Sequence, residues 1–291
     1  MHPNLLEEFS QIHIRAHQTQ LPGLSLKNVK NAIAVGSGKG GVGKSTLTVN
    51  LAASLARLGA RVGILDADIY GPSIPTMLGK TNPVEIIDNR YQPVIAHGIQ
   101  AMSIGYLTQE ENNTLIWRGP MLAKALIQML DMTAWDDLDY LFIDLPPGTG
   151  DIQLSLVQKI PLAGAIVITT PQQVATNDAS KALTMFEKMN IPRLGLIENM
   201  SHHQCNACGH ISTLFGEGGA TRLAEKHRTT LLGTLPLHQA IQKHADQGSP
   251  IAHHTHEMAN HFLELALRMA LRLNEQPLNY ANRFPPVVSE I

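Results

Sequence analysis

One eight-residue stretch limits the folds open to this chain more than any other. Residues 38–45 read Gly-Lys-Gly-Gly-Val-Gly-Lys-Ser and satisfy the pattern G-x-x-x-x-G-K-[S/T]. An apolar run at 32–35 precedes the stretch, and leucines at helical spacing follow it over 45–58. Glycines let the backbone turn successive N–H groups toward phosphate oxygens, and a helix N-terminus adds partial positive charge there. The stretch therefore predicts a strand, a phosphate-binding loop and a helix, rather than a chance glycine-rich turn.

This loop predicts contacts with a nucleoside triphosphate, with ATP and Mg²⁺ as the expected cofactors. Lys44 is expected to lie against the β- and γ-phosphates, and the Ser45 hydroxyl is expected to ligate Mg²⁺. The residues expected to bind the nucleotide are those of the loop and the one after it: Gly38, Lys39, Gly40, Gly41, Val42, Gly43, Lys44, Ser45 and Thr46.

The rest of the chain alternates between short apolar runs and helical patterns. Strands are expected at 32–35, 61–65, 140–143, 165–169, 194–197 and 230–235. Helices are expected at 45–58, 121–132, 152–159, 177–189, 219–227 and 254–271, and residues 66–119 are less regular. Buried strands that alternate with helices are typical of an α/β fold with a mostly parallel sheet and helices on both faces. We expect a helical arm at 1–30, a P-loop ATPase domain at 31–273 and a C-terminal tail at 274–291.

Acidic residues follow two of the expected strands. Asp66 and Asp68 follow the strand at 61–65, and Asp144 ends the strand at 140–143. Carboxylates at the carboxyl ends of parallel strands beside a phosphate loop are placed to organise Mg²⁺ and water. Asp144 is expected to hold Mg²⁺ through water, and Asp66 to support the Mg²⁺ shell or Lys44. Turn formation or helix capping is the alternative for such residues, and Asp151 is expected to cap the next helix.

The two cysteines of the chain, Cys205 and Cys208, are expected to be metal ligands. Two thiolates supply half of a tetrahedral four-cysteine site, and a symmetric dimer with this loop near its two-fold axis supplies all four. Such a site suits a [4Fe–4S] cluster or Zn²⁺. His202, His203 and His210 offer an alternative, since they could complete a zinc site within one chain. A structural pair without metal and a redox pair also stay open.

The sequence K-G-G-x-G-K-S over residues 39–45 resembles the phosphate loop of the MinD/ParA class of ATPases. The resemblance implies a nucleotide-sandwich homodimer in which Lys39 reaches the partner's nucleotide, so that Lys39, Lys44 and Asp68 are catalytic, with Asp68 orienting the attacking water. It further implies that the Gly148 N–H senses the γ-phosphate and that Asn199 contacts adenine. The alternatives are a solvated lysine at 39 and a turn asparagine at 199.

More widely, the chain resembles the Mrp/ApbC family of iron–sulfur carrier ATPases. The motifs that carry this resemblance lie at 38–45, 66–73, 117–121, 144–151, 170–172, 198–201, 205–208, 215–219 and 235–237. The resemblance implies a homodimer that binds a labile [4Fe–4S] cluster at Cys205 and Cys208. It also implies slow ATP hydrolysis, cluster scaffold proteins as partners, and transfer to apo iron–sulfur proteins. His238 departs from the family pattern, which usually has an acidic residue there.

Composition argues against two other classes of partner. A net charge of −2 and 4% aromatic residues give no basis for binding nucleic acid. No apolar run is long enough to span a bilayer and the first residues lack a secretory core, so we expect no membrane partner and a cytoplasmic location. Histidines 253, 254, 256 and 261 are expected to be a solvated helix start. The alternative functions are a MinD/ParA-like nucleotide-switch ATPase and a zinc-bridged dimeric regulator.

Overall fold

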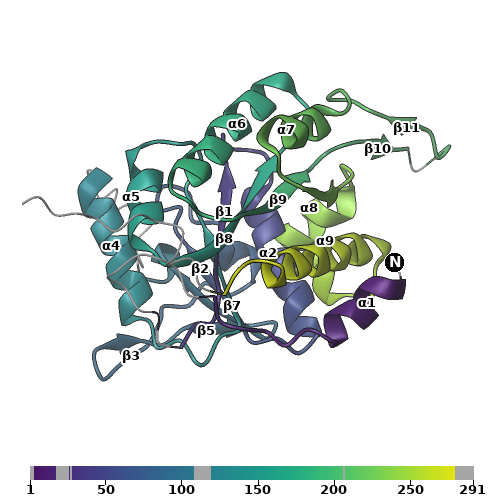
Figure 1. Cartoon of the computed structure of the whole chain (residues 1–291). Helices are drawn as coiled ribbons and strands as arrows, with labels where there is room; N and C mark the ends of the chain where they lie inside the picture. Colours follow the sequence, from purple (N-terminus) through teal and green to yellow (C-terminus); the bar gives the residue numbers. More distant parts are fainter. Residues whose placement is uncertain (1–2, 18–25, 27, 108–118, 206, 279–291) are drawn as a thin grey trace, which may run out of the picture.

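The computed structural model describes residues 3–17, 26, 28–107, 119–205 and 207–278. Their centre is an eight-stranded sheet in the order β12-β9-β8-β1-β7-β2-β6-β5 (Figure 1). Seven of these strands run parallel, and β5 (Val94–Ala96) pairs antiparallel with β6 at one edge. The parallel strands are β1 (Ala32–Ser37), β2 (Val62–Asp66), β6 (Ile99–Ser103), β7 (Tyr140–Asp144), β8 (Leu162–Thr169), β9 (Arg193–Glu198) and β12 (Leu231–Thr234).

Helices cover both faces of the sheet, which confirms the predicted α/β class. One face is covered by α2 (Lys44–Arg57) and α9 (Glu257–Asn274), which pack against each other, and α1 (Pro3–Ser10) lies on α9 (Figure 1). The other face is covered by α4 (Gly119–Met132), α5 (Asp151–Lys159), α6 (Gln173–Lys188) and α7 (Gly219–His227). Because both faces are covered, every residue of β1, β7 and β8 is buried, as expected for continuous apolar runs in a parallel sheet.

Within the stretch at 66–119, the described residues 66–107 contain more regular structure than the sequence suggested. They contain α3 (Ile74–Met77), the hairpin of β3 (Ile86–Ile87) and β4 (Arg90–Tyr91), the strands β5 and β6, and the 3-10 helix η1 (Ile104–Tyr106). β6 is a buried member of the main sheet, although Gln100 interrupts its apolar run. The expectation of an irregular segment was therefore wrong for these residues.

The end of the chain also differs from expectation. α8 (Gln239–Asp246) was not predicted, because it is largely polar and none of its residues is buried. α9 begins at Glu257 rather than at 254, because the His256 ring nitrogen accepts the Met258 N–H and caps the helix. The 3-10 helix η2 (Ile251–His253) occupies the residues before that cap.

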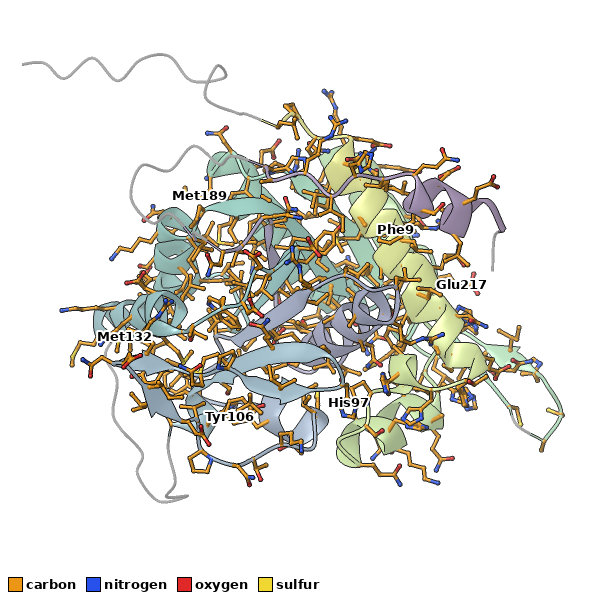
Figure 2. The ribbon with its side chains drawn as sticks, turned by 90° about the horizontal axis from the view of Figure 1, so that it is seen from below. Phe9, His97, Tyr106, Met132, Met189 and Glu217 are labelled. Atoms are coloured by element: carbon orange, nitrogen blue, oxygen red, sulfur yellow. The ribbon has the colours of Figure 1, made fainter. Side chains whose placement is uncertain are left out.

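The described part of the expected N-terminal arm is helical only in α1. Phe9 packs from α1 onto the core beside α9 (Figure 2), and the His17 backbone N–H donates to the Asn31 side chain at the start of β1. Only residues 274–278 of the expected tail belong to the described chain. Within the described residues, no helix combines the length and apolar character that crossing a membrane requires.

Candidate nucleotide and metal site

The phosphate loop runs from the end of β1 to the start of α2. Gly41 and Gly43 have φ angles of 78° and 85°, in the left-handed region where a side chain is strained. No side chain caps α2, so its first N–H groups remain open toward the loop. A cavity of about 180 Å³ lies over this helix end. Its lining joins three motifs: Ser37, Lys39, Gly40, Gly41, Gly43, Lys44, Ser45 and Thr46 of the loop, Asp68, Ser73 and Met77 beyond β2, and Pro147 beyond β7.

The buried carboxylate of Asp144 holds the lysine and the hydroxyls of the loop. Its Oδ2 accepts from Lys44 Nζ at 2.7 Å and from Ser45 Oγ at 2.5 Å, and its Oδ1 accepts from Thr48 Oγ1 at 2.7 Å. Lys44 and Asp144 are both buried. The chemistry of this donor set fits Mg²⁺, because a carboxylate and a serine hydroxyl meet where the loop would place a nucleotide's phosphates. Sequence reasoning missed Thr48, although it lies one helical turn after Lys44 and so faces the same side.

Asp66 lies beside Asp144, because their strands pair in register at these two residues. The Asp66 side chain accepts from the Asp68 and Ile74 backbone N–H groups and from Ser103 Oγ. Burial first, and then the charge of Asp144, raise the pKa of Asp66 to about 7. These bonds make Asp66 the anchor of the loop at 67–74, and its expected part in a Mg²⁺ shell stays a prediction.

Asp68 lines the cavity and is only partly buried. Desolvation raises the pKa of its carboxyl, and the Lys44 charge and the Gly71 and Tyr70 N–H groups act in the opposite direction. Asp68 therefore borders the same cavity as the phosphate loop. Its catalytic role stays a prediction.

Lys39 belongs to the phosphate loop, and Gly148 belongs to the loop after β7, next to the cavity residue Pro147. Lys39 lines the cavity, and among the described residues its ammonium group makes no ion pair or hydrogen bond. The Gly148 N–H donates to the Ser37 carbonyl at 3.1 Å, which ties the loop after β7 to the phosphate loop. Asp151 does not cap α5 as expected, because Gly150 is the cap residue and Asp151 is the first helical residue. Its charge still suits that end of the helix.

Asn199 lies beneath the phosphate loop. Its Nδ2 donates to the Val42 carbonyl at 2.9 Å, and its Oδ1 accepts the Met200 N–H at 3.0 Å. The amide thus contacts the phosphate loop itself, a contact that the sequence reasoning did not foresee. The expected contact with adenine stays a prediction.

The cysteines lie on a hairpin that follows β9, formed by β10 (His203–Gln204) and β11 (Ile211–Ser212). The Cys205 N–H donates to the His210 carbonyl, and the Gly209 N–H donates to the Cys205 carbonyl. Cys205 is partly buried and Cys208 is exposed, and neither forms a disulfide. Hydrogen bonds from the Cys208 and Ala207 backbone N–H groups lower the pKa of the Cys205 thiol. Backbone donors aimed at sulfur suit a thiolate that binds metal.

Among the described residues, the histidines near the cysteines are not arranged to complete a metal site within one chain. In the described part of the chain, no group of three or more histidine, cysteine or acidic side chains is arranged to hold a metal ion. His202 instead contacts Ser201 Oγ at 2.9 Å through its Nδ1. The alternative of a zinc site completed within one chain by His202, His203 and His210 is therefore not supported by the described residues.

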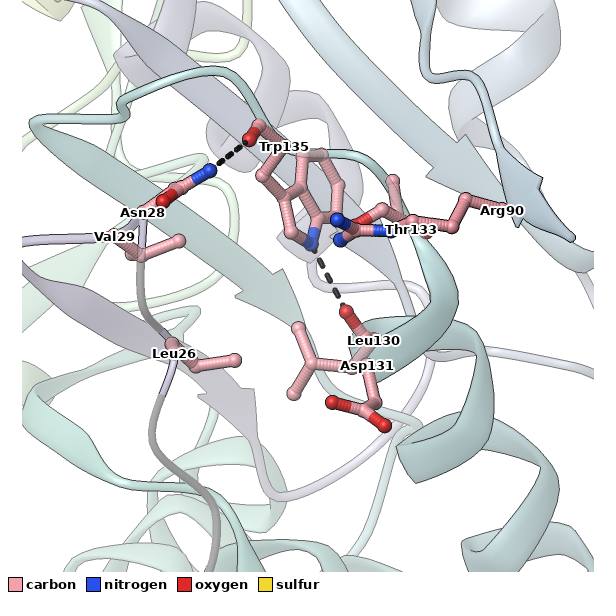
Figure 3. A pocket seen from close by; sticks show the side chains of 8 residues that line it. All are labelled: Leu26, Asn28, Val29, Arg90, Leu130, Asp131, Thr133 and Trp135. Atoms are coloured by element: carbon pink, nitrogen blue, oxygen red, sulfur yellow. Dashed lines mark hydrogen bonds between the residues drawn. The ribbon is translucent and has the colours of Figure 1, made fainter. Parts of the chain in front are cut away.

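A larger cavity of about 290 Å³ lies away from these motifs, between the segment before β1 and the end of α4 (Figure 3). The Asn28 side chain donates to the Trp135 carbonyl there, and Trp135 Nε1 donates to the Leu130 carbonyl. The cavity contains none of the predicted site residues.

Comparison with known proteins decides the family. Residues 28–270 match the family described as ParA, NUBPL iron-transfer P-loop NTPase. The chain belongs to this family. The chain is 54% identical to the iron-sulfur cluster carrier protein of Escherichia coli K12 over 87% of its own length and 69% of the relative's. It is 43% identical to the mouse iron-sulfur cluster transfer protein NUBPL over 94% of its length and 86% of the relative's.

Solved structures have the same fold. A nucleotide-binding protein from Archaeoglobus fulgidus in complex with ADP, in which Co was found, superposes with a TM-score of 0.68 at 40% identity. The match covers 77% of this chain and 88% of that one. The cell division ATPase MinD of Pyrococcus furiosus superposes with a TM-score of 0.62 at 20% identity, over 82% and 98% of the two chains. The second likeness supports the fold alone.

Proposed function

We propose that this protein binds and slowly hydrolyses ATP, and that two copies of it carry a [4Fe–4S] cluster which they deliver to apo iron–sulfur proteins. The observation that carries the proposal is the placement of Cys205 and Cys208 on a hairpin at the carboxyl ends of the parallel strands, the end of the sheet that also bears the phosphate loop. The names of the similar bacterial and mouse proteins support cluster transfer as the activity. Cluster scaffold proteins would supply the cargo.

The number of thiols supports a shared site. Each chain has only two cysteines, whereas a [4Fe–4S] cluster takes four thiolate ligands. Two hairpins related by a two-fold axis supply the four thiolates. The hairpins are suited to such an encounter, because Cys208 is exposed and the neighbouring apolar side chains of Ile211 and Leu214 are 58% and 60% exposed.

Exposed apolar residues at the same edge support the homodimer. Val174 follows β8 and is 66% exposed, and Leu237 follows β12 and is 37% exposed. Because the strands are parallel, both residues lie at the carboxyl edge of the sheet together with the phosphate loop and the hairpin. A second copy that covers this edge would bury these side chains and bring its own loop close to the first.

The hydrolysis step is assigned to residues of the cavity. Lys44 would hold the β- and γ-phosphates, and Asp68 would orient the water that attacks the γ-phosphorus. Lys39, whose ammonium has no partner among the described residues, would reach the partner's nucleotide and stabilise charge on the transferred phosphoryl group. Mg²⁺, when held by Ser45 and through water by Asp144, would neutralise charge on the phosphate oxygens.

The test is transfer of a cluster. Anaerobically reconstituted protein is mixed with an apo-enzyme whose activity requires a [4Fe–4S] cluster, and the recovery of that activity is followed with a chelator present. We expect recovery from the wild type and none from Cys208→Ser, with Ser212→Ala as the control on the same hairpin. The proposal fails if free iron and sulfide at equal concentration restore activity as fast as the protein does. Tight binding of Zn²⁺ without cluster transfer would instead support a zinc-bridged regulator.

A further inference from the structure

Residues 200–204 are all that separates the side chain that contacts the phosphate loop from the first cysteine. Asn199, on one side of this segment, contacts the phosphate loop, and Cys205, on the other side, begins the turn of the hairpin. A change in the loop and a change at the thiols can therefore be joined through a single short segment.

Asn199 is placed to respond to the phosphate loop. Its Nδ2 holds the Val42 carbonyl, and a Cβ added at Gly43 would lie only 2.3 Å from the same nitrogen. The backbone N–H of Asn199 donates to the Thr169 carbonyl at the end of β8 at 2.8 Å. The amide is hydrogen-bonded to the Val42 carbonyl and lies close to Gly43, so rotation of the peptides at 42–43 toward a phosphate would move it.

The segment after Asn199 is stiff enough to pass on a displacement. Met200 has a φ of 55°, which a non-glycine residue keeps only when its surroundings hold it there. The Ser201 N–H donates to the Leu235 carbonyl at 2.9 Å, and the Leu237 N–H donates to the His202 carbonyl at 2.7 Å. Residues 201 and 202 are thus bonded to the chain after β12, the Met200 N–H is bonded to the Asn199 side chain, and β10 follows directly.

We propose that Asn199 is a positioning residue that transmits nucleotide occupancy of the phosphate loop to Cys205 and Cys208. Binding of phosphates reorients the Val42 peptide, Asn199 moves with its carbonyl, and the left-handed residue Met200 turns this movement into a shift of the hairpin. The inference rests on the proposed function only in taking the two cysteines as the cluster ligands. It supplies the physical link between ATP and cargo.

The test measures thiol reactivity in protein that carries no cluster. The alkylation rates of Cys205 and Cys208 by iodoacetamide are measured by peptide mass spectrometry, without nucleotide and with saturating Mg²⁺ and a non-hydrolysable ATP analogue. We expect the nucleotide to change the wild-type rate about fivefold or more, within the range known for coupled sites. For Asn199→Ala the nucleotide affinity is measured first, so that the analogue is used at a saturating concentration, and the rate is then expected to change less than about 1.5-fold, because most of the coupling has been lost.

Two further variants separate coupling from folding. Asn177→Ala, an exposed asparagine of α6, is the matched control and is expected to keep the full nucleotide response. Met200→Gly keeps every side chain of the site and frees the left-handed position, so it is expected to bind nucleotide normally with a smaller thiol response. Thermal unfolding midpoints measured for each variant establish that the proteins compared are folded.

A full nucleotide response in Asn199→Ala, or none in the wild type, would overturn the inference. Cluster reconstitution on the same preparations separates this failure from failure of the proposed function. Cluster binding without a thiol response refutes the coupling alone, and a thiol response without cluster binding refutes the carrier function alone.

Discussion

At the scale of single residues, Asp144 organises the site. It accepts from Lys44, Ser45 and Thr48, and it is buried, so removal of its cationic partner leaves a carboxylate without charge compensation. Lys44 therefore has two separable tasks, since it pairs with Asp144 and is expected to bind phosphate. A single substitution at Lys44 disturbs both of them.

Lys44→Ala is expected to abolish nucleotide binding and to lower the free energy of unfolding by about 3 kcal/mol, the scale for breaking a buried ion pair. Lys44→Ala/Asp144→Asn removes the stranded charge and is expected to recover more than half of this stability, still without binding nucleotide. Urea unfolding and calorimetric titration with ADP measure the two effects. Both proteins should bind the cluster, and an unstable double variant would contradict the electrostatic explanation.

Asp68→Asn is expected to slow ATP hydrolysis by about a hundredfold or more, because a neutral amide orients and polarises the attacking water less well than a carboxylate does. Nucleotide affinity should stay within about threefold of the wild type, or less than about 0.7 kcal/mol of binding free energy. Phosphate release and ADP titration provide the two readouts. Equal losses in rate and in affinity would instead make Asp68 a binding residue.

At the scale of elements, six histidines pack against one another around α8 and the start of α9. We call this cluster of His97, His238, His244, His253, His254 and His256 the joint. The ring centroids of His244 and His254 lie 4.7 Å apart, those of His97 and His253 5.2 Å, and those of His238 and His256 5.8 Å. His238 and His256 cap α8 and α9 through ring nitrogens that accept a backbone N–H, which a doubly protonated ring cannot do. Of the histidines expected at a solvated helix start, His253 and His261 are exposed, whereas His254 and His256 are partly buried in this contact between elements.

Burial lowers the pKa values of both His253 and His254. The charges of His97 and Arg57 lower the pKa of His253 further. The charge of His244 lowers the pKa of His254 further. The folded state therefore binds fewer protons than the unfolded chain, and stability falls as the pH drops below about 6.5. We expect a smaller loss between pH 7.5 and pH 5.5 in His254→Asn than in the wild type, measured by urea unfolding.

His261→Asn, an exposed histidine of α9 outside the joint, is the control for this experiment and is expected to behave as the wild type. Asp66 contributes stability as the pH falls, since folding raises its pKa and favours its protonated form. This contribution is the same in the wild type and in both variants, so it does not affect the comparison. An unchanged pH dependence in His254→Asn would refute the role of the joint.

The sequence predicted the elements that a simple apolar period marks. β1, β7 and β8 are continuous apolar runs, and α7 was predicted with the bounds that the structure has. β6 and α8 were not predicted. β6 has a polar residue within a buried strand, and α8 has no buried face. The motifs correctly grouped Lys44, Ser45 and Asp144. The contact of Asn199 with Val42 joins residues 157 positions apart, which no local pattern reveals.

At the scale of the whole molecule, the phosphate loop, the acidic residues and the cysteine hairpin all lie at the carboxyl edge of the sheet, where the parallel strands end. Parallel strands with right-handed crossovers place the loops that follow them on one side, and ligands bind there. Val174 and Leu237 expose apolar surface at this edge. The same edge would therefore serve both as the reaction site and as the contact between two copies.

Val174→Asp is expected to weaken the dimer formed with Mg²⁺ and a non-hydrolysable ATP analogue by about a hundredfold in Kd, because the symmetric interface contains the substituted residue twice. Ile95→Asp is the matched control, since Ile95 is similarly exposed but lies on β5 at the lateral end of the sheet. Sedimentation velocity over a concentration series provides the constants. An unchanged dimer constant in Val174→Asp, or equal weakening in Ile95→Asp, would contradict an interface that contains Val174.

The central claim is that two chains share one cluster through Cys205 and Cys208. It is tested most directly by anaerobic reconstitution with iron and sulfide, followed by native mass spectrometry and iron and sulfide analysis. The account predicts a dimer that holds about four irons and four sulfides, and complete loss of both in Cys205→Ala/Cys208→Ala. A cluster that persists in the double variant, or one bound by a single chain, would contradict it.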